Sequence, residues 1–400
     1  MGTGKLAGFA YIVLIAASLA AGAPILYDLP VTPGVSGFQL TADGSVAVGT
    51  VGSNPVVWTA AQGVHVLANV NPSSPFLPTG AATAASADGI YIAGYQNVSV
   101  GSSTVNQPVR WGPGGTINLG DLDTSGFADN KFGRAHGVSA NGSIVVGETG
   151  SPTNRQAFRW TALGGMLGLG KLPGDSLSRA SDVSGDGAVV VGSSVLEGAP
   201  LNDHGFRWTA ATGLIAIPDL PGGLDISTPN AITPDGNIIV GAGSSTASSG
   251  GSTGLKAEAY RWTAATGTAP LGDLPGGDYY SIALDVTANG NTVVGYSFVD
   301  GSTRAFIWDQ AHGMRSLQDV LEMEYGVNLG GRTLFRADSI SDDGNVISGT
   351  GRLADGTNQS WIINLIPEPT GLALVAAGGL LLQRRRRKGE TNLYASRTYL

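Results

Sequence analysis

The sequence predicts an all-β protein, a seven-bladed β-propeller of four-stranded blades that is closed into a ring by its N-terminal strand. Three observations predict this fold. A tight-turn dipeptide recurs seven times, one tryptophan follows each turn, and a segment near the N-terminus matches the strand that the last unit lacks. Internal periodicity of this kind is the sequence signature of repeat architectures.

The repeat is marked by an Asp-Gly or Asn-Gly dipeptide and by tryptophan. The dipeptides are Asp43-Gly44, Asp88-Gly89, Asn141-Gly142, Asp186-Gly187, Asp235-Gly236, Asn289-Gly290 and Asp343-Gly344. The seven tryptophans of the chain, 46 to 54 residues apart, are Trp58, Trp111, Trp160, Trp208, Trp262, Trp308 and Trp361. Between two apolar runs these dipeptides indicate hairpins, because both residues tolerate the positive φ of a tight turn.

Each unit is predicted to contain four strands, as the fourth unit illustrates. Its strands are expected at residues 180–184 before the turn, 189–191 after it, 205–208 around the tryptophan, and 215–220 after a second tight turn. Four strands in about 50 residues fit the four-stranded blades of a propeller. Because a single blade cannot bury both of its faces, the tryptophans are predicted to pack between blades. Their use as sugar-stacking platforms is the alternative.

The two ends of the repeat region predict how the ring closes. Residues 25–30 match the fourth-strand pattern of residues 271–275. After Trp361 the chain runs into Pro367 without such a strand. The N-terminal strand is therefore expected to complete the seventh blade, which also removes the exposed edges of an open array.

Residues 1–22 are predicted to be a secretory signal peptide. Lys5 precedes an apolar run at residues 6–21, and small residues crowd the end of that run. This order of charge, apolar stretch and small residues is typical of export signals. Cleavage is expected after Ala21 or Gly22, because Pro24 obstructs a later cut. The run is long for a signal, so an uncleaved anchor is the alternative.

The C-terminal segment, residues 367–388, combines three features. The triplet Pro367, Glu368, Pro369 is followed by an uncharged run at residues 370–382 and then by the basic cluster Arg384, Arg385, Arg386, Arg387 and Lys388. This order resembles the PEP-CTERM sorting signal. The resemblance implies a short transmembrane sorting helix with the basic cluster on the cytoplasmic side. It also implies that an exosortase-type membrane peptidase cuts near the triplet and passes the protein to the cell surface or an exopolysaccharide matrix.

A plain C-terminal membrane anchor is the alternative to a sorting signal. The apolar run of residues 370–382 is short for a bilayer span, which needs about 20 residues. A tail at residues 389–400 extends beyond the basic cluster, where such signals usually stop. The predicted organisation is therefore a signal peptide (1–22), a repeat region (23–366), a sorting signal (367–388) and a tail (389–400).

The repeat units resemble the HAF family of extracellular repeat proteins. The matching segments are the Ala-Phe-Arg-Trp run at residues 157–160, the Leu-Gly-Asp-Leu-Pro-Gly-Gly run at residues 271–277, and the turn with its Val-Val-Gly strand. A helix-like stretch at residues 318–325 is typical of a terminal repeat. The family's histidine is present only at His204. The resemblance covers about residues 25–365 and implies an exported repeat protein without an established enzymatic activity.

Composition excludes several function classes. The chain has no cysteine, so disulfides and thiolate metal sites are excluded. Residues 24–383 hold 15 basic and 29 acidic residues, a net charge of about −14. An acidic body does not favour nucleic acid or an anionic lipid surface as a partner, since both require basic patches.

The titratable residues do not predict a catalytic or metal site. The four histidines, His65, His136, His204 and His312, fall in different units. A metal site or a catalytic triad needs several groups that converge. Acidic loops offer oxygen ligands to Ca²⁺, but no run has a complete ligand spacing, so no cofactor is predicted. The arginines that precede the tryptophans are expected to stack, or to pair with acids within their own blade.

Ligand binding, if it occurs, is predicted on the rim that carries the variable connections. The gap from the glycine after the second strand to the tryptophan varies from 9 residues (49 to 58) to 21 (241 to 262). Variable loops on a rigid scaffold are where binding usually resides. The predicted contacts are Phe76, Phe127, Tyr279, Tyr280 and Tyr325. The acids that break the repeat, and are therefore the candidates for catalysis, are Asp129, Asp203, Glu322 and Glu324.

These inferences predict an exported, non-catalytic binding or structural protein of the cell surface or extracellular matrix. Its expected partners are the secretion machinery, an exosortase-type peptidase, and exopolysaccharide or another surface protein. The alternative is a propeller enzyme that acts on extracellular polysaccharide. A convergent pair of carboxylates on the variable rim or in the axial channel would favour that enzyme.

Overall fold

The computed structural model describes residues 23–366, apart from residues 30–36, 72, 74–77, 101–102, 123–131, 152–153, 196–202 and 249–256. The predicted signal peptide, the predicted sorting signal and the tail therefore lie outside the described residues. Within the described part of the chain, no helix is long and apolar enough to cross a membrane.

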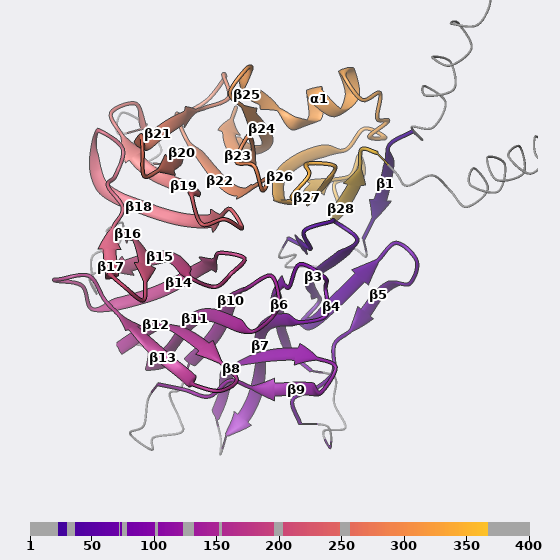
Figure 1. Cartoon of the computed structure of the whole chain (residues 1–400). Helices are drawn as coiled ribbons and strands as arrows, with labels where there is room; N and C mark the ends of the chain where they lie inside the picture. Colours follow the sequence, from indigo (N-terminus) through magenta and orange to yellow (C-terminus); the bar gives the residue numbers. More distant parts are fainter. Residues whose placement is uncertain are drawn as a thin grey trace, which may run out of the picture. The chain divides into compact units, whose positions relative to one another are not determined.

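Residues Leu26–Ile363 form one compact unit of β-sheets arranged around a central axis (Figure 1). Five sheets have four strands each. One contains β2 (Gln39–Leu40), β3 (Val46–Val51), β4 (Asn54–Thr59) and β5 (Gly63–Val66). Another contains β14 (Leu177–Val183), β15 (Val189–Val195), β16 (Asp203–Thr209) and β17 (Gly213–Ala216). A third contains β18 (Gly222–Ile232), β19 (Ile238–Ser245), β20 (Glu258–Thr263) and β21 (Gly267–Gly272).

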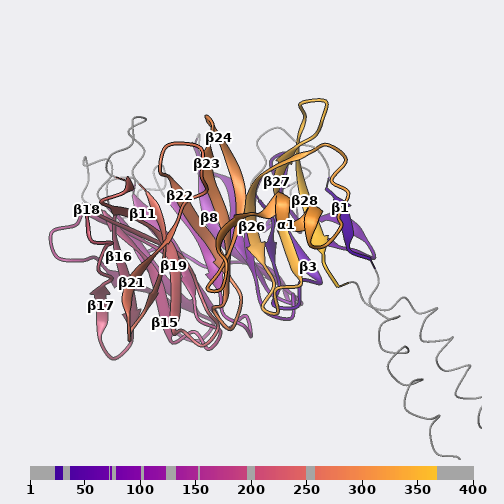
Figure 2. The ribbon, with the colours of Figure 1, turned by 90° about the horizontal axis from the view of Figure 1, so that it is seen from above.

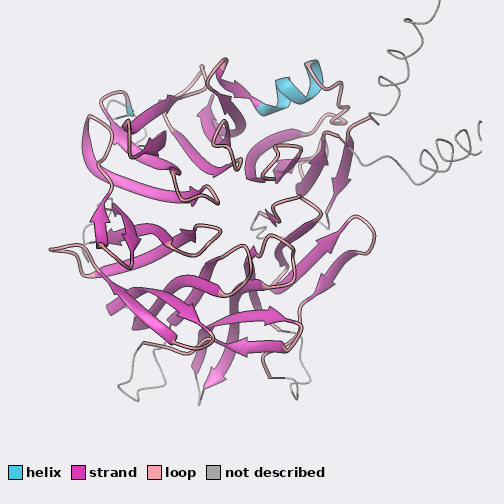
Figure 3. Ribbon diagram, in the orientation of Figure 1, coloured by secondary structure: helices cyan, strands magenta, loops and turns pink. Residues whose placement is uncertain are grey.

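The remaining two four-stranded sheets come from the C-terminal part of the unit. One contains β22 (Ser281–Val286), β23 (Thr292–Val299), β24 (Ser302–Asp309) and β25 (Gly313–Ser316). The other contains β26 (Thr333–Ile340), β27 (Val346–Arg352), β28 (Asn358–Asn364) and the N-terminal strand β1 (Ile25–Asp28). The helix α1 (Leu317–Met323), cyan in Figure 3, lies between β25 and β26 in the chain. It begins where Ser316 accepts a hydrogen bond from the Asp319 backbone N–H.

The remaining strands form one eight-stranded sheet. It contains β6 (Gly80–Ala85), β7 (Ile92–Val100), β8 (Ser103–Gly112), β9 (Gly115–Asn118), β10 (Phe132–Val138), β11 (Ile144–Ser151), β12 (Asn154–Thr161) and β13 (Gly165–Gly170). Its two halves meet where Phe132 of β10 pairs in parallel with Asn106 of β8. Figure 2 shows the unit from above.

The prediction of seven separate four-stranded blades is wrong, although the all-β, propeller-like class is confirmed. Hydrogen bonding gives five four-stranded blades, and the strands of two consecutive repeats share a single sheet. The two repeats are joined at one point, where Phe132 of β10 pairs in parallel with Asn106 of β8, and no other parallel pairing of this kind links repeats among the described residues.

The N-terminal strand closes the ring as expected, because β1 lies beside β28 in the last sheet. Leu29 is 1% exposed and packs in a cluster that includes Phe38, Trp58 and Ile362. The Leu29 N–H donates to the Ser360 carbonyl oxygen over 3.1 Å. This closure brings residues that are more than 300 positions apart in the sequence into one core.

The recurring Asp-Gly and Asn-Gly turns share one hydrogen-bonding pattern. In the fourth repeat, the Ser184 hydroxyl donates to Asp186 Oδ1 over 2.7 Å and accepts from the Val189 N–H over 3.0 Å. Asp186 Oδ1 also accepts from the Ala188 N–H over 2.9 Å. Equivalent hydroxyl-to-carboxylate or hydroxyl-to-amide bonds start at Thr41, Ser86, Ser139, Thr233, Thr287 and Ser341. The repeated acids of the sequence are therefore parts of turns.

Apolar contacts join neighbouring repeats. Ala93 and Leu119 of the second repeat form one cluster with Val145, Phe158 and Trp160 of the third. Five of the seven tryptophans are buried, at Trp58, Trp111, Trp160, Trp208 and Trp361. Packing against residues of a neighbouring repeat accounts for Trp58, Trp111, Trp160 and Trp208.

Candidate functional site

The axis of the unit is lined by the first strand of each repeat, and β-bulges set which side chains face it. From β6 onward, the pairing of each of these strands with its neighbour includes a shift that skips one residue. A bulge leaves that residue unpaired and changes the direction of its side chain. The skipped residues are Thr83, His136, Ser181, Asn230, Leu284 and Asp338, and all six line one cavity.

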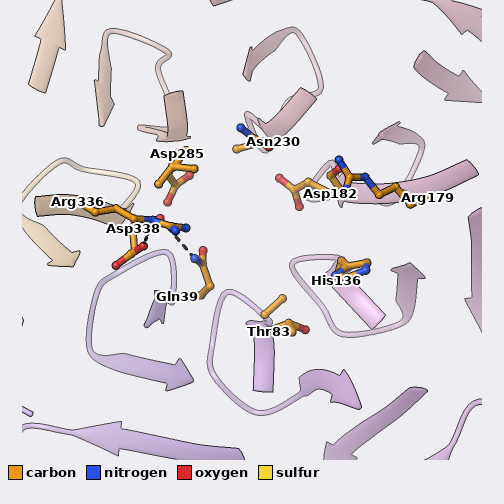
Figure 4. Close-up of a pocket in the computed structure, with 14 residues that line it drawn as sticks. Gln39, Thr83, His136, Arg179, Asp182, Asn230, Asp285, Arg336 and Asp338 are labelled. Carbon is orange, nitrogen blue, oxygen red and sulfur yellow. Dashed lines mark hydrogen bonds and ion pairs between the residues drawn. The ribbon is translucent and has the colours of Figure 1, made fainter. Parts of the chain in front are cut away.

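This axial cavity has a volume of about 310 Å³ and a polar wall (Figure 4). Besides the six bulge residues, its wall contains Gln39, Ala84, Arg179, Ala180, Asp182, Ala231, Asp285 and Arg336. A second cavity of about 160 Å³ continues toward the turns and is also lined by Asp182 and Asp285. These two aspartates therefore stand where the two cavities meet.

Asp182 joins the fourth repeat to the fifth. Its Oδ2 accepts from the Ile232 N–H over 3.0 Å, and its Oδ1 accepts from the Val183 N–H over 2.7 Å. Burial raises the pKa of Asp182 to about 7, against the effect of these two hydrogen bonds, and the charge of Asp285 adds to the rise. The carboxyl is thus fixed in position and titrates near neutrality.

Asp285 joins the sixth repeat to the seventh in the same way. Its Oδ2 accepts from the Ser339 hydroxyl over 2.6 Å and from the Ile340 N–H over 2.9 Å. Burial raises the pKa of Asp285 to about 6, although these hydrogen bonds and one from the Val286 N–H oppose the rise. Both carboxylates therefore hold neighbouring repeats together and also face the cavity.

Asp338 is the third carboxylate of the cavity and, unlike the half-buried Asp182 and Asp285, it is buried. Its Oδ1 lies 2.5 Å from Arg336 Nε, and its side chain is fully buried. Within the described residues, Asp338 Oδ2 has no hydrogen-bond partner. Burial raises the pKa of Asp338 to about 6, although the Arg336 charge opposes the rise. Gly37 packs against this carboxyl group, because a Cβ at position 37 would overlap Asp338 Cγ.

Two other basic groups of the cavity wall, Arg179 and His136, have acidic partners outside it. Arg179 Nη2 lies 3.7 Å from Asp203 Oδ2, and Arg179 Nε donates to the Ser193 hydroxyl over 2.9 Å. His136 Nε2 lies 3.5 Å from Glu148 Oε1. Burial raises the pKa of Glu148, but the hydrogen bond and charge of His136, together with nearby arginine charges, leave that pKa below its ordinary value. These basic groups are therefore not dedicated partners of Asp182 and Asp285.

Neutral side chains perform the same joining role in other repeats. The Thr83 hydroxyl donates to the Ala135 carbonyl oxygen over 2.9 Å, and Asn230 Nδ2 donates to the Ala283 carbonyl oxygen over 2.8 Å. Gln39 Nε2 donates to the Asp338 carbonyl oxygen over 3.4 Å. The ring can thus be held together at these positions without charge.

No group of three or more His, Cys, Asp or Glu side chains in the described residues could hold a metal ion. The acidic turns considered for Ca²⁺ have their carboxylates occupied by hydroxyl and backbone N–H donors, as at Asp186.

Three of the five predicted rim residues lie within the described chain, and none of them lines the axial cavity. The Tyr279 hydroxyl donates to Glu258 Oε1 over 2.9 Å. Burial raises the pKa of Tyr279, and the hydrogen bond to the Glu258 carboxylate and its charge raise that pKa further. The Tyr280 ring lies 6.3 Å from that of Tyr296. Tyr325 is 43% exposed and follows α1. Phe76 and Phe127 lie outside the described residues.

The acids that break the repeat do not converge. Asp203 lies near Arg179, as described above. Glu322 is on α1, and Glu324 Oε1 accepts from Arg315 Nη1 over 2.6 Å. Asp129 lies outside the described residues. The structure therefore gives these acids no shared site within the described chain.

The arginines before the tryptophans were predicted to stack, or to pair with acids of their own blade; Arg110 stacks, whereas no such ion pair is formed among the described residues. Arg110, Arg159 and Arg261 donate to the backbone oxygens of Gly142, Gly187 and Gly290, respectively, in the turn of the next repeat. Arg110 also stacks on the rings of Tyr91 and Trp160, at 4.5 and 4.9 Å from their centroids. These arginines therefore join repeats.

Sequence reasoning missed Asp182, Asp285 and Asp338. Asp182 and Asp285 stand four positions before the Asp or Asn of their turns, where the second, third and fifth repeats have Ala84, Gly137 and Ala231. That contrast was a usable signal. The bulge that precedes this position in each of these repeats has no mark in the sequence, so strand alternation alone did not place the three aspartates at the axis.

No protein-family model and no curated protein sequence matches the chain. Among solved structures, the chain is similar to TolB from Acinetobacter baumannii, with 13% identity, a TM-score of 0.43, and coverage of 84% of this chain and 80% of that one. It is also similar to a prolyl endopeptidase, with 9% identity, a TM-score of 0.47, and coverage of 83% of this chain and 47% of that one. Similarity at this level transfers no activity to the chain.

Proposed function

We propose that this protein is an exported, non-catalytic binding or structural protein of the cell surface or extracellular matrix. The observation that supports binding is the axial cavity, a concave polar space whose acidic side chains are held in place by hydrogen bonds between repeats. A carboxylate that accepts backbone N–H bonds on both oxygens is fixed in position before a ligand arrives, which lowers the cost of binding.

Export and sorting are supported by the sequence. Residues 1–22 have the order of a secretory signal, and the acidic, cysteine-free body suits an extracellular protein. The Pro367-Glu368-Pro369 triplet with its basic cluster supports processing by an exosortase-type peptidase. The proposed partners are this peptidase, the secretion machinery, and matrix polysaccharide or another surface protein.

A second candidate, an enzyme acting on extracellular polysaccharide, is favoured by one observation. Asp182 and Asp285 line the same cavity and have raised pKa values of about 7 and about 6. Paired carboxyl groups of different pKa are the usual machinery of glycoside hydrolysis. Against this reading, both carboxylates already accept hydrogen bonds that join repeats.

Retention of extracted matrix polysaccharide and of an array of defined glycans by the purified, secreted protein tests the proposal. We expect saturable retention of matrix polysaccharide or of at least one glycan class, and the same result with a second preparation of protein. If folded protein retains neither the matrix extract nor any glycan, polysaccharide binding is rejected. The part of the proposal that then stands is a structural role or the binding of another protein.

A further inference from the structure

Among the described residues, two carboxylates of the axial cavity, Asp182 and Asp285, have no ion-pair partner. The ion pairs made by the described wall residues join Arg336 to Asp338, Arg179 to Asp203 and His136 to Glu148. Within the part of the chain that the structure describes, Asp182 and Asp285 accept from neutral donors, namely backbone N–H groups and the Ser339 hydroxyl. A charge removed from water is costly unless an opposite charge lies beside it. Two carboxylates without an ion-pair partner, both facing a cavity, therefore point to a ligand that supplies the positive charge.

The fold itself does not require these charges. The equivalent positions of the other five repeats hold no acid; they are Gln39, Ala84, Gly137, Ala231 and Ser339. Hydrogen bonds between repeats are made elsewhere by neutral side chains, as Thr83 and Asn230 show. A residue that every repeat needs should recur in every repeat, and an acid at this position recurs in only two of the seven.

The rest of the cavity suits hydroxyl groups. Gln39, Thr83 and Asn230 offer neutral donors and acceptors on its wall. A cavity of about 310 Å³ is at the lower end of the range for small-molecule sites, roughly 300–1,000 Å³.

We propose that the axial cavity binds a small amino sugar, whose ammonium group lies between Asp182 and Asp285 and whose hydroxyl groups bond to Gln39, Thr83 and Asn230. This inference rests on the proposed polysaccharide-binding function and names the ligand class of the same cavity. Ammonium-to-carboxylate hydrogen bonds are roughly twice as strong as neutral ones, so the site should discriminate amino sugars from neutral sugars.

The pH dependence of binding follows from the groups that face the cavity. These are Asp182 on β14 and Asp285 on β22, together with His136 on β10, Arg179 on β14, and Arg336 and Asp338 on β26. Because burial raises the pKa of Asp182 and of Asp285, both carboxyls gain charge between about pH 5 and about pH 7. Binding of a cationic ligand should strengthen over that range and should release protons.

The test is isothermal titration calorimetry of the full-length or secreted protein with glucosamine, glucose and N-acetylglucosamine. Glucose replaces the ammonium group by a hydroxyl, and N-acetylglucosamine neutralises it. We expect glucosamine to bind at about pH 7 and both neutral sugars to bind at least roughly tenfold more weakly. Glucosamine affinity should also fall at about pH 5, where the carboxyls are protonated.

Two variants locate the site. Asp182→Ala and Asp285→Ala introduce the residue that the equivalent positions of other repeats already have, and each should weaken glucosamine binding by roughly tenfold or more. Asp186→Asn is the matched control, because Asn141 and Asn289 occupy that turn position in other repeats, and it should leave binding unchanged.

Three results would overturn the inference: no binding of glucosamine, equal binding of glucosamine and glucose, or unchanged binding in folded alanine variants. If a variant does not fold, the comparison of sugars and of pH on the parent protein still decides the matter. Retention of matrix polysaccharide without glucosamine binding would reject this inference alone and leave the proposed function standing.

Discussion

Asp182 Oδ2 accepts a hydrogen bond from the backbone N–H of Ile232, 50 positions later in the chain, over 3.0 Å. Asp285 makes the equivalent bond to the N–H of Ile340, 55 positions later, over 2.9 Å. The same carboxyl groups face the axial cavity. Cohesion of the ring and the candidate binding site therefore depend on the same two side chains.

The free energy of unfolding should depend on pH through the Asp182 carboxyl, whose pKa is raised in the folded protein. Its folded pKa of about 7 lies above the ordinary value of 3.8, so the folded protein binds this proton more tightly than the unfolded chain does. The resulting stabilisation is fully present below about pH 4 and is lost as the pH rises through about 7. Each pKa unit is worth on the order of 1 kcal/mol.

Urea unfolding of the parent and of Asp182→Ala at about pH 4.5, 6 and 8 isolates this contribution. The free-energy advantage of the parent over the variant should decrease steadily as the pH rises. An advantage that stays constant over the whole range would show that Asp182 titrates like an exposed carboxyl group.

Ring closure should depend on the N-terminal strand. Leu29→Ala should lower the free energy of unfolding by about 2–5 kcal/mol, because Leu29 is buried in the core that joins the first and last repeats. Deletion of residues 25–30 should cost more, since it also removes the ion pair between Asp28 and Arg332, whose Oδ1 and Nη1 lie 2.6 Å apart. Leu163→Ala, at a fully exposed site, is the control and should change stability by less than about 0.5 kcal/mol. An unchanged melting temperature after the deletion would rule out closure.

The tight turns should tolerate a side chain only where no neighbouring repeat approaches. Gly142 has a φ of +71°, and a Cβ at this position would overlap the Tyr91 ring of the preceding repeat. Gly165 has a similar φ of +67°, but a Cβ at this position would have no other atom within 4 Å. Gly165→Ala should cost about 1 kcal/mol from backbone strain, and Gly142→Ala about 1–3 kcal/mol more from the clash. Equal losses in thermal or urea unfolding would mean that Tyr91 moves aside freely.

The sequence predicted the hairpins well, because Asp186-Gly187 and its counterparts are both the sequence signal and the physical turn. The number of blades was predicted wrongly, because the parallel pairing of Phe132 with Asn106 joins two repeats and has no signal in the repeat pattern. The cavity residues were missed for a related reason. A β-bulge shifts the alternation of each first strand, so the faces of Ser181 and Asp182 cannot be assigned by counting along the strand.

The C-terminal triplet predicts a defined end for the mature protein. If an exosortase-type peptidase processes the chain, surface-released protein should end near Pro367 and lack Arg384 to Arg387. Intact-mass measurement of the released protein reports this end directly. Replacement of Glu368 by alanine should reduce release, whereas Glu390→Ala, beyond the basic cluster, should not. Released protein that still ends at Leu400 would mean that the segment is an anchor or a plain tail.

The proposed binding function requires that the protein binds extracellular polysaccharide without cleaving it. The most direct measurement incubates purified protein with extracted extracellular polysaccharide and follows both retention of the polymer and the appearance of new reducing ends. The parent and the Asp182→Ala, Asp285→Ala double variant are compared. We expect the parent to retain polysaccharide and to generate no new reducing ends above a protein-free control. Reproducible turnover by the parent that is lost in the folded double variant would contradict this expectation and establish the enzyme.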